Sequence, residues 1–151
     1  MLITAAFSRE ISLADLIELH LSRTSNTLDA ALYRFNSRRL AAALAASATR
    51  GVQLRLLLDR NKHEGDPGTQ QLLADYQLPF RLLQGPGGPA SKMHHKFVIL
   101  DQRLVITGSY NWTSESEEEN YENLLSLNDA AQIERYRDEF EALWTEAKKS
   151  D

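Results

Sequence analysis

Segments with strand-like and helix-like patterns alternate along the first part of this chain, and their order constrains the fold more than any other feature. The predicted strands are residues 2–7, 27–35 and 52–58, and the predicted helices are residues 13–21 and 40–49. Asn36 or Ser37 can cap the second helix, and Gly51 ends it. The last of these strands is almost continuously apolar, which is typical of a strand buried on both faces. This order predicts an α/β fold with a mixed, largely parallel β-sheet flanked by helices on both faces.

The rest of the chain continues with shorter elements. We expect a loop at 61–68, a short helix to about residue 76, strands at 78–83, 97–100, 104–107 and 124–127, and a closing helix at about 129–148. The segment Gly85–Pro89 predicts a mobile or tightly turned loop, and residues 101–103 predict a hairpin. The closing helix carries an apolar stripe made of Ile133, Tyr136, Phe140, Leu143 and Trp144.

Length and composition exclude several classes of protein. A chain of 151 residues predicts one domain, residues 1–151, with a single core. The absence of cysteine excludes a disulfide scaffold, a cysteine zinc finger, an iron–sulfur cluster and a cysteine nucleophile. No apolar run approaches the ~20 residues that span a bilayer, and the apolar start lacks the basic residues of a secretory signal. We therefore expect a cytoplasmic protein without a membrane partner.

Charge is distributed unevenly along the chain. Residues 1–104 hold 13 Lys and Arg against 9 Asp and Glu, whereas residues 105–151 hold 4 against 12. We expect a polyanion to dock on the first two-thirds, because affinity for nucleic acid rests on cations that neutralise phosphates. Taken singly, each of these cations is most simply a solvated charge. The candidate cations are Arg34, Arg38, Arg39, Arg50, Arg55, Arg60 and Lys62.

The segment KMHHKFVILDQRLVITGSYNWT, residues 92–113, combines side chains that suit a phosphate group. Strand alternation places His94 and Lys96 on one face and His95 on the other. Ser109 and Asn111, two residues apart beyond the next strand, can point the same way once the hairpin folds. An imidazole, an ammonium, a hydroxyl and an amide then surround one point with no carboxylate among them. Donors of this kind bind the non-bridging oxygens of a phosphate.

These residues resemble the phospholipase D superfamily motif H-x-K-x4-D-x6-G-S-x-N. The motif is matched without departure by His94, Lys96, Asp101, Gly108, Ser109 and Asn111. Downstream, Asn120–Asn123 followed by LLSL is also similar to the family and contains its glutamate, here Glu122. The chain carries one copy of the motif, whereas lipid-cleaving members usually carry two. It therefore most resembles the small bacterial endonuclease branch, whose members act as homodimers with the site at the two-fold interface.

The resemblance implies a mechanism without cofactor or metal. His94 would attack phosphorus and form a covalent phosphohistidine. The partner subunit's His94 would protonate the leaving alkoxide and later assist water. Lys96 and Asn111 would bind the non-bridging oxygens of the substrate.

The other motif positions would support this site. Ser109 would stabilise the pocket by hydrogen bonds, and Glu122 would accept a hydrogen bond from the imidazole of His94 and fix its tautomer. Asp101 would lie away from the phosphate in a mainly structural role. Gly108 would allow a tight turn into the pocket.

Simpler interpretations stand beside these roles. His94 and His95 could be metal ligands, although the other histidines, His20 and His63, lie far off in sequence. Tyr110 and Trp112 are more often packing residues than platforms for stacked bases. The glutamates at 115 and 117–119 are most simply a solvated helix face, and their charge near the motif disfavours tight binding of long duplex DNA.

Taken together, the sequence predicts a metal-independent nuclease that hydrolyses DNA or RNA. A lipid phosphodiesterase is the alternative within the family, although it calls for an apolar rim or an amphipathic surface helix, and the closing helix directs its apolar face to the core. A non-catalytic binding module is the third possibility, but such a module would not need all six motif positions.

Overall fold

The computed structural model describes residues 1–150, with side chains described as far as Ala147. One seven-stranded sheet forms the centre, in the order β1-β7-β6-β5-β2-β3-β4. The strands are β1 (Ile3–Phe7), β2 (Thr27–Leu32), β3 (Gln53–Asp59), β4 (Arg81–Leu83), β5 (Lys96–Leu100), β6 (Leu104–Gly108) and β7 (Asn123–Leu127). The helices are α1 (Leu13–Ser22), α2 (Arg38–Thr49), α3 (Arg60–Glu64), α4 (Pro67–Asp75), α5 (Ser114–Glu118) and α6 (Ala130–Ser150).

The prediction of a mixed sheet is confirmed, but the prediction that it is largely parallel is wrong. Only β2–β3 and β3–β4 pair in parallel, whereas β1–β7, β7–β6, β6–β5 and β5–β2 are antiparallel. Helical crossovers connect the parallel strands, as expected. After residue 95, a short turn joins β5 to β6, and β7 returns beside β6, which gives antiparallel pairs. β1 forms one edge of the sheet, where it pairs with β7. It therefore does not pair with its sequence neighbour β2, which lies among the inner strands.

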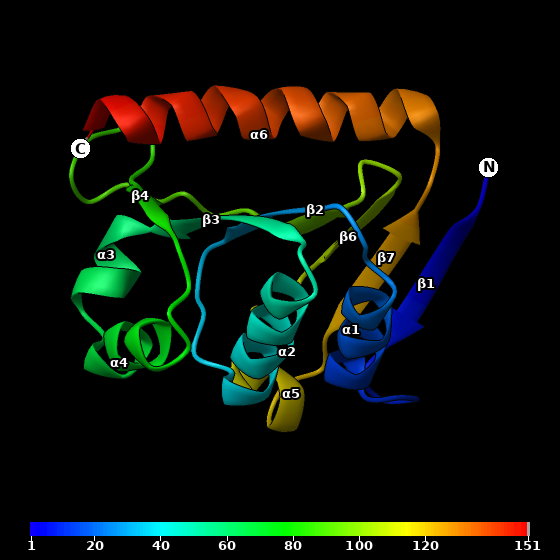
Figure 1. Cartoon of the computed structure of the whole chain (residues 1–151). Helices are drawn as coiled ribbons and strands as arrows, with labels where there is room; N and C mark the ends of the chain where they lie inside the picture. Colours follow the sequence, from blue (N-terminus) through cyan, green and yellow to red (C-terminus); the bar gives the residue numbers. More distant parts are fainter. Residues whose placement is uncertain (151) are drawn as a thin grey trace.

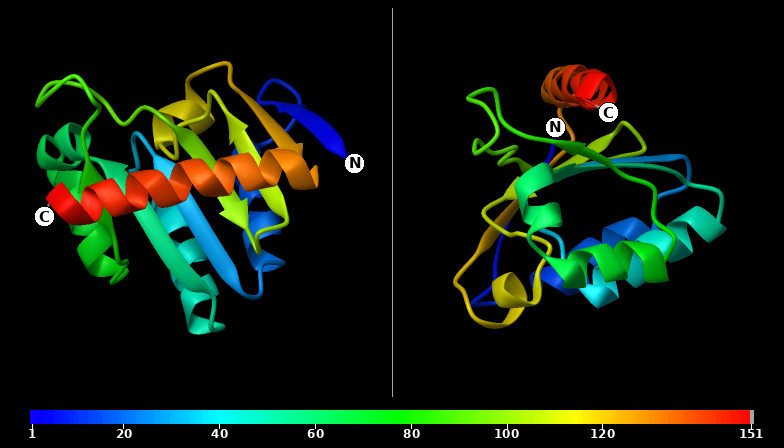
Figure 2. Two further views of the ribbon diagram at one scale, coloured as in Figure 1. Left: turned by 90° about the horizontal axis from the view of Figure 1, so that it is seen from above. Right: turned by 90° about the vertical axis from the view of Figure 1, so that its left-hand side faces the viewer.

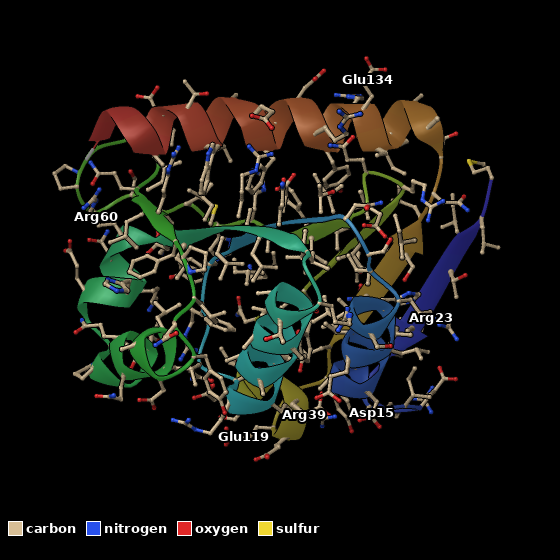
Figure 3. All side chains as sticks on the ribbon, viewed as in Figure 1. Asp15, Arg23, Arg39, Arg60, Glu119 and Glu134 are labelled. Atoms are coloured by element: carbon tan, nitrogen blue, oxygen red, sulfur yellow. The ribbon has the colours of Figure 1, made fainter. Side chains whose placement is uncertain are left out.

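Helices cover both faces of the sheet, as predicted (Figure 1). Figure 2 shows α6 alone on one side, with α1, α2 and α4 on the other. The core under α1 and α2 is built mainly from leucines, among them Leu28, Leu40 and Leu56, all fully buried. The smaller core under α6 contains Phe97, Ile99 and the predicted apolar stripe of that helix. Glu134 lies on the outer face of α6 and points away from the sheet (Figure 3).

Arg55 links the sheet to α6 through two ion pairs. The Asp29 carboxylate on β2 accepts two hydrogen bonds from Arg55 on β3, at 2.8 and 2.9 Å. The Arg55 guanidinium also pairs with Glu141 and lies over the rings of Phe140 and Trp144. This arginine, one of the predicted phosphate-binding candidates, is therefore a packing and pairing residue.

Two local predictions need correction. Residues 61–68 are not a loop, because the Asp59 carboxylate accepts from the Lys62 amide and starts the five-residue helix α3. The strand expected at 78–83 is shortened to β4. Gly85–Pro89 is a tight turn, closed by the Ser91 hydroxyl and amide donating to the Gly88 carbonyl. Within residues 1–150, no helix is both long and apolar enough to cross a membrane.

The alternation of strand directions brings many strand ends to one edge of the sheet. The carboxyl ends of β1, β2, β3, β4 and β6 meet there with the amino ends of β5 and β7. The residues of the predicted site, apart from Asp101, all lie at or just beyond these ends.

Candidate active site

The imidazole of His94 and the ammonium of Lys96 form the centre of the site. The Lys96 Nζ atom lies 3.4 Å from His94 Nδ1 and donates to the His94 carbonyl at 3.2 Å. His94 is exposed and Lys96 is half-buried at the start of β5. His95 turns the other way, as alternation predicts: its Nε2 atom lies 3.1 Å from a carboxylate oxygen of Glu139 on α6. The two adjacent histidines therefore do not converge on one point.

Tyr33 is a member of this site that the sequence did not indicate. It follows β2, is buried, and its ring centroid lies 4.4 Å from that of His94. The ammonium groups of Lys96 and Lys62 lie 5.4 and 5.6 Å from the centroid of the same ring. No local pattern could identify Tyr33, because its contact with His94 depends on β2 and β5 being neighbours in the sheet.

Ser109 and Glu122 form a second pair at the same edge. The Ser109 hydroxyl donates to Glu122 Oε1 at 2.5 Å and accepts from the Asn123 amide at 3.1 Å. The other oxygen of Glu122 accepts from the Asn120 side chain at 3.1 Å. Among the described residues, the partners of the Glu122 carboxylate are Ser109 and Asn120, and the predicted hydrogen bond from His94 is not formed. In the described part of the chain, Glu122 holds the serine in place and does not orient the imidazole.

Asn111 lies beyond β6 with its backbone held and its amide oxygen free. Its N–H donates to the Ser116 hydroxyl at 3.2 Å, and its carbonyl accepts from the Thr113 amide at 2.7 Å. The Asn111 Oδ1 atom is buried and has no hydrogen-bond partner among residues 1–150. A buried polar atom without a partner costs free energy unless a ligand or water satisfies it. The amide of Asn111 is therefore a candidate binding group.

The electrostatics of the centre favour a neutral imidazole beside a cation. Partial burial lowers the pKa of His94, and the positive charges of Lys96 and Lys92 lower it further. Partial burial also lowers the pKa of Lys96, and the negative charge of Glu122 opposes that change. A neutral imidazole has a free nitrogen lone pair near neutral pH, so it can act as a nucleophile.

Asp101 and Gly108 have structural roles. The Asp101 carboxylate lies at the opposite end of β5, where it accepts from the amides of Ser25, Asn26 and Thr27 at 3.0, 2.6 and 3.1 Å. Gly108 does not form the expected tight turn, because it is the last residue of β6. A Cβ atom there would lie 2.2 Å from the Asn123 carbonyl oxygen. Only glycine lets β7 approach this closely.

The aromatic and acidic residues after the motif are mostly structural. Tyr110 and Trp112 are buried, at 1% and 3% exposure, so they pack in the core and do not offer stacking surfaces. Glu117 accepts from the Ser12 hydroxyl, the Ala14 amide and the Tyr110 hydroxyl, and so fixes the start of α1. Glu115 pairs with Arg34 and Asn36. The prediction of a fully solvated acidic face is therefore wrong for these two glutamates, and it holds for Glu118 and Glu119, which are exposed.

The residues through Ala147 contain no group of three or more histidine, aspartate or glutamate side chains arranged to hold a metal ion. The predicted alternative of a metal site at His94 and His95 fails on geometry, since one imidazole faces Lys96 and the other faces Glu139.

Comparison with known proteins agrees with the motif. The family model described as a cardiolipin synthase, PLD-like domain matches residues 17–144. Human mitochondrial cardiolipin hydrolase is 36% identical over 118 residues, which are 78% of this chain and 45% of that protein. A phospholipase D from Rickettsia bellii is 31% identical over 104 residues, which are 69% of this chain and 50% of that protein. The chain thus spans about half the length of these relatives.

Solved structures show the same fold over nearly the whole chain. The phospholipase D family member Nuc from Salmonella typhimurium superposes with a TM-score of 0.82 at 24% identity, covering 95% of this chain and 94% of that one. NucT from Helicobacter pylori gives a TM-score of 0.81 at 21% identity, covering 95% and 97%. The six motif positions, the matched family model and the relatives more than 30% identical lead to one conclusion: the chain belongs to the phospholipase D superfamily of phosphodiesterases.

Proposed function

We propose that this protein is a metal-independent nuclease that hydrolyses phosphodiester bonds in DNA or RNA through a covalent phosphohistidine. The observation that carries the proposal is the imidazole of His94 with the Lys96 ammonium 3.4 Å away, an arrangement in which partial burial and the lysine charge lower the pKa of His94. A phosphodiester carries a negative charge, which must be compensated before a neutral nucleophile can attack phosphorus. Lys96 supplies this charge where the non-bridging oxygens would lie, and the side-chain N–H groups of Asn111 are the donors that would bind these oxygens.

The reaction balances in two steps. A nitrogen of His94 forms a bond to phosphorus while the bond from phosphorus to the leaving oxygen breaks, and an imidazolium gives that oxygen a proton. A water molecule then attacks phosphorus, loses a proton to the same second imidazole, and releases His94. Each step needs one imidazole in the neutral form and one that exchanges protons.

The second imidazole comes from a second copy of the chain in this proposal. Within one chain, the nearest histidine in sequence, His95, is turned towards α6 and cannot reach the leaving group. We infer that two chains meet about a two-fold axis with their His94 residues facing each other, so that the partner subunit's His94 acts as the acid.

A comparison of substrates tests this function. Purified protein is incubated with single-stranded DNA, duplex DNA and RNA in excess EDTA, with cardiolipin vesicles alongside. We expect cleavage of at least one nucleic acid and no loss of rate with EDTA, because the site supplies its own nucleophile and cation. If EDTA abolishes turnover and magnesium or zinc restores it, the mechanism is wrong. Binding without turnover on any phosphodiester would favour the binding module.

A lipid phosphodiesterase is the second candidate function. It is favoured by the relatives named cardiolipin hydrolases and by two exposed aromatic residues beside Glu122. Phe7 and Tyr121 are 48% and 89% exposed and border the same hollow as Glu122. Faster turnover of cardiolipin than of any nucleic acid, lost on Tyr121→Ser, would establish this candidate in place of the nuclease.

A further inference from the structure

A cavity of about 210 Å³ lies beside the nucleophile, on the side of the sheet edge formed by β2 and β3. Tyr33 forms the wall between this cavity and His94, since its ring contacts the imidazole and also lines the cavity. Arg34, Asn36, Asn61 and Lys62 are polar residues that line the cavity. The motif does not include any of these residues, so the motif alone assigns the cavity no role.

Lys62 differs from the other cations that the sequence offered for phosphate binding. Six of the seven candidates are occupied by carboxylates or backbone carbonyls. The partners are Glu115 for Arg34, Asp75 for Arg38, Asp15 and Glu18 for Arg39, the Leu21 and Thr24 carbonyls for Arg50, Asp29 and Glu141 for Arg55, and Glu64 for Arg60. Within the described residues, Lys62 makes no ion pair, and its ammonium contacts the ring of Tyr33.

Figure 3 labels three of the residues that are engaged in ion pairs, Asp15, Arg39 and Arg60. Asp15 and Arg39 lie together at the ends of α1 and α2, where they form an ion pair. Arg60 lies at the start of α3, on the same short helix as Lys62, and pairs with Glu64 one turn later. The exposed ammonium of Lys62 is thus available to an anion, whereas the neighbouring arginine is engaged.

The acidic residues around this cavity do not repel an anion strongly. The Asp59 carboxylate accepts from the amides of Lys62 and Met93, both at 2.9 Å. The Asp66 carboxylate accepts from the amides of Gly68 and Thr69 and from the Thr69 hydroxyl. Each carboxylate therefore lies against the positive end of a helix or turn, which offsets its charge.

The other side of His94 is less suited to an anionic chain. A groove of about 890 Å³ runs there between the 85–92 turn and α6. Lys92 lines this groove, but Glu139 and Glu146 line it too, and much of its remaining wall is apolar. A polyanion that reaches His94 therefore meets less opposing charge on the Tyr33 side.

We propose that Lys62 binds the phosphate next to the scissile one, and that the substrate strand leaves the site across Tyr33. This inference rests on the proposed nuclease function and narrows its substrate class to a polynucleotide that carries a phosphate next to the scissile one. Lys62 and Lys96 both lie within 5.6 Å of the centroid of one tyrosine ring. Because both ammoniums contact this one ring, neighbouring phosphates of a strand that crosses it would each meet one of them. A phosphodiester with a single phosphate gains nothing from Lys62.

The test compares two substrates in the variant Lys62→Gln. One is a single-stranded oligonucleotide, and the other is bis(p-nitrophenyl) phosphate, which carries one phosphate only. We expect the ratio of kcat/KM for the oligonucleotide to kcat/KM for the small diester to fall about tenfold, as for the loss of one charge-assisted contact. The slope of log(kcat/KM) against log[salt] for the oligonucleotide should also become shallower by about 0.7.

The matched control is Arg103→Gln, which removes the same charge at the opposite end of β5 and should leave both the ratio and the slope as in the wild type. An unchanged ratio in Lys62→Gln would overturn the inference, and so would an equal loss on both substrates. Hydrolysis of the small diester without cleavage of any oligonucleotide would instead overturn the nuclease function itself. Circular dichroism of both variants checks that each is folded like the wild type.

Discussion

At the scale of single residues, His94 is the proposed nucleophile, and its replacement should have little effect on stability. Its side chain is exposed at the sheet edge and contacts the Tyr33 ring and Lys96. We expect His94→Ala to lower the rate of phosphodiester hydrolysis at least ~10³-fold, because the nucleophile is lost. The free energy of unfolding in urea should change by only about 0.5 kcal/mol, as for other surface positions.

His95→Ala is the control for this prediction, since the neighbouring imidazole faces Glu139 and not the reaction centre. Its rate should stay within a few-fold of the wild type. More than a tenth of wild-type activity in His94→Ala would contradict the assigned nucleophile.

The pH dependence of activity follows from the charges around His94. Because burial, Lys96 and Lys92 all lower the pKa of His94, its imidazole stays neutral to a more acidic pH than the ordinary value of 6.5. The acid limb of the rate profile should therefore have its midpoint below 6.5, and protonation should stop attack at still lower pH.

Lys92→Gln removes one of these charges, so the midpoint of the acid limb should move upward, towards 6.5. The shift should be largest at low ionic strength, because salt screens an exposed lysine. Profiles of kcat/KM measured at two salt concentrations check this. A midpoint that moves downward, or that does not move at low salt, would contradict the electrostatic account.

At the scale of elements, Asp101 joins the β5–β6 hairpin to the residues that lead into β2. Its carboxylate accepts three backbone hydrogen bonds, and its φ of 54° is one that asparagine tolerates well. Asp101→Asn keeps the shape but removes the charge, so we expect a loss of about 1–3 kcal/mol in the free energy of unfolding at pH 7.

The pH dependence of stability distinguishes the loss of the Asp101 charge from a general loss of packing. Although partial burial raises the pKa of Asp101, the amides of Ser25, Asn26 and Thr27 outweigh it, so the folded-state pKa lies below the ordinary 3.8. The stabilisation is complete above 3.8 and is lost as the pH falls through the lower, folded-state value. Urea unfolding at pH 7 and at pH 3 should show the difference between wild type and variant shrinking in acid; a constant difference would argue for packing.

At the scale of the whole molecule, one chain supplies one motif histidine where the proposed chemistry needs two. Light scattering at assay concentration should give about twice 17.1 kDa. Adding an excess of His94→Ala protein to wild type, under conditions that exchange subunits, should lower turnover per wild-type chain, because mixed dimers lack one imidazole. Full activity from a monomer would contradict a site shared by two subunits. So would the absence of inhibition after subunit exchange has been demonstrated.

Most of the elements were predictable from local patterns, and so was the identity of the motif. Helical periodicity, a cap at Asn36 or Ser37 and the apolar stripe of α6 are confirmed, with the cap at Ser37, because each depends on residues close in sequence. α3 was missed because five residues capped by Asp59 are too few to show a helical period. The order of the strands could not be predicted, because pairings such as β1 with β7 depend on contacts between distant segments.

The motif alone was enough to identify the family and to place an imidazole beside an ammonium, because His94 and Lys96 are two residues apart along one strand. Which charges remain available to a ligand depends instead on how the elements pack. Arginines and glutamates that look alike in sequence separate into paired and free groups once the helices pack, so Arg39 is occupied and Lys62 is not. The contacts of Tyr33 with His94 and of Glu122 with Ser109 also depend on tertiary structure, since each joins strands whose adjacency no local pattern encodes.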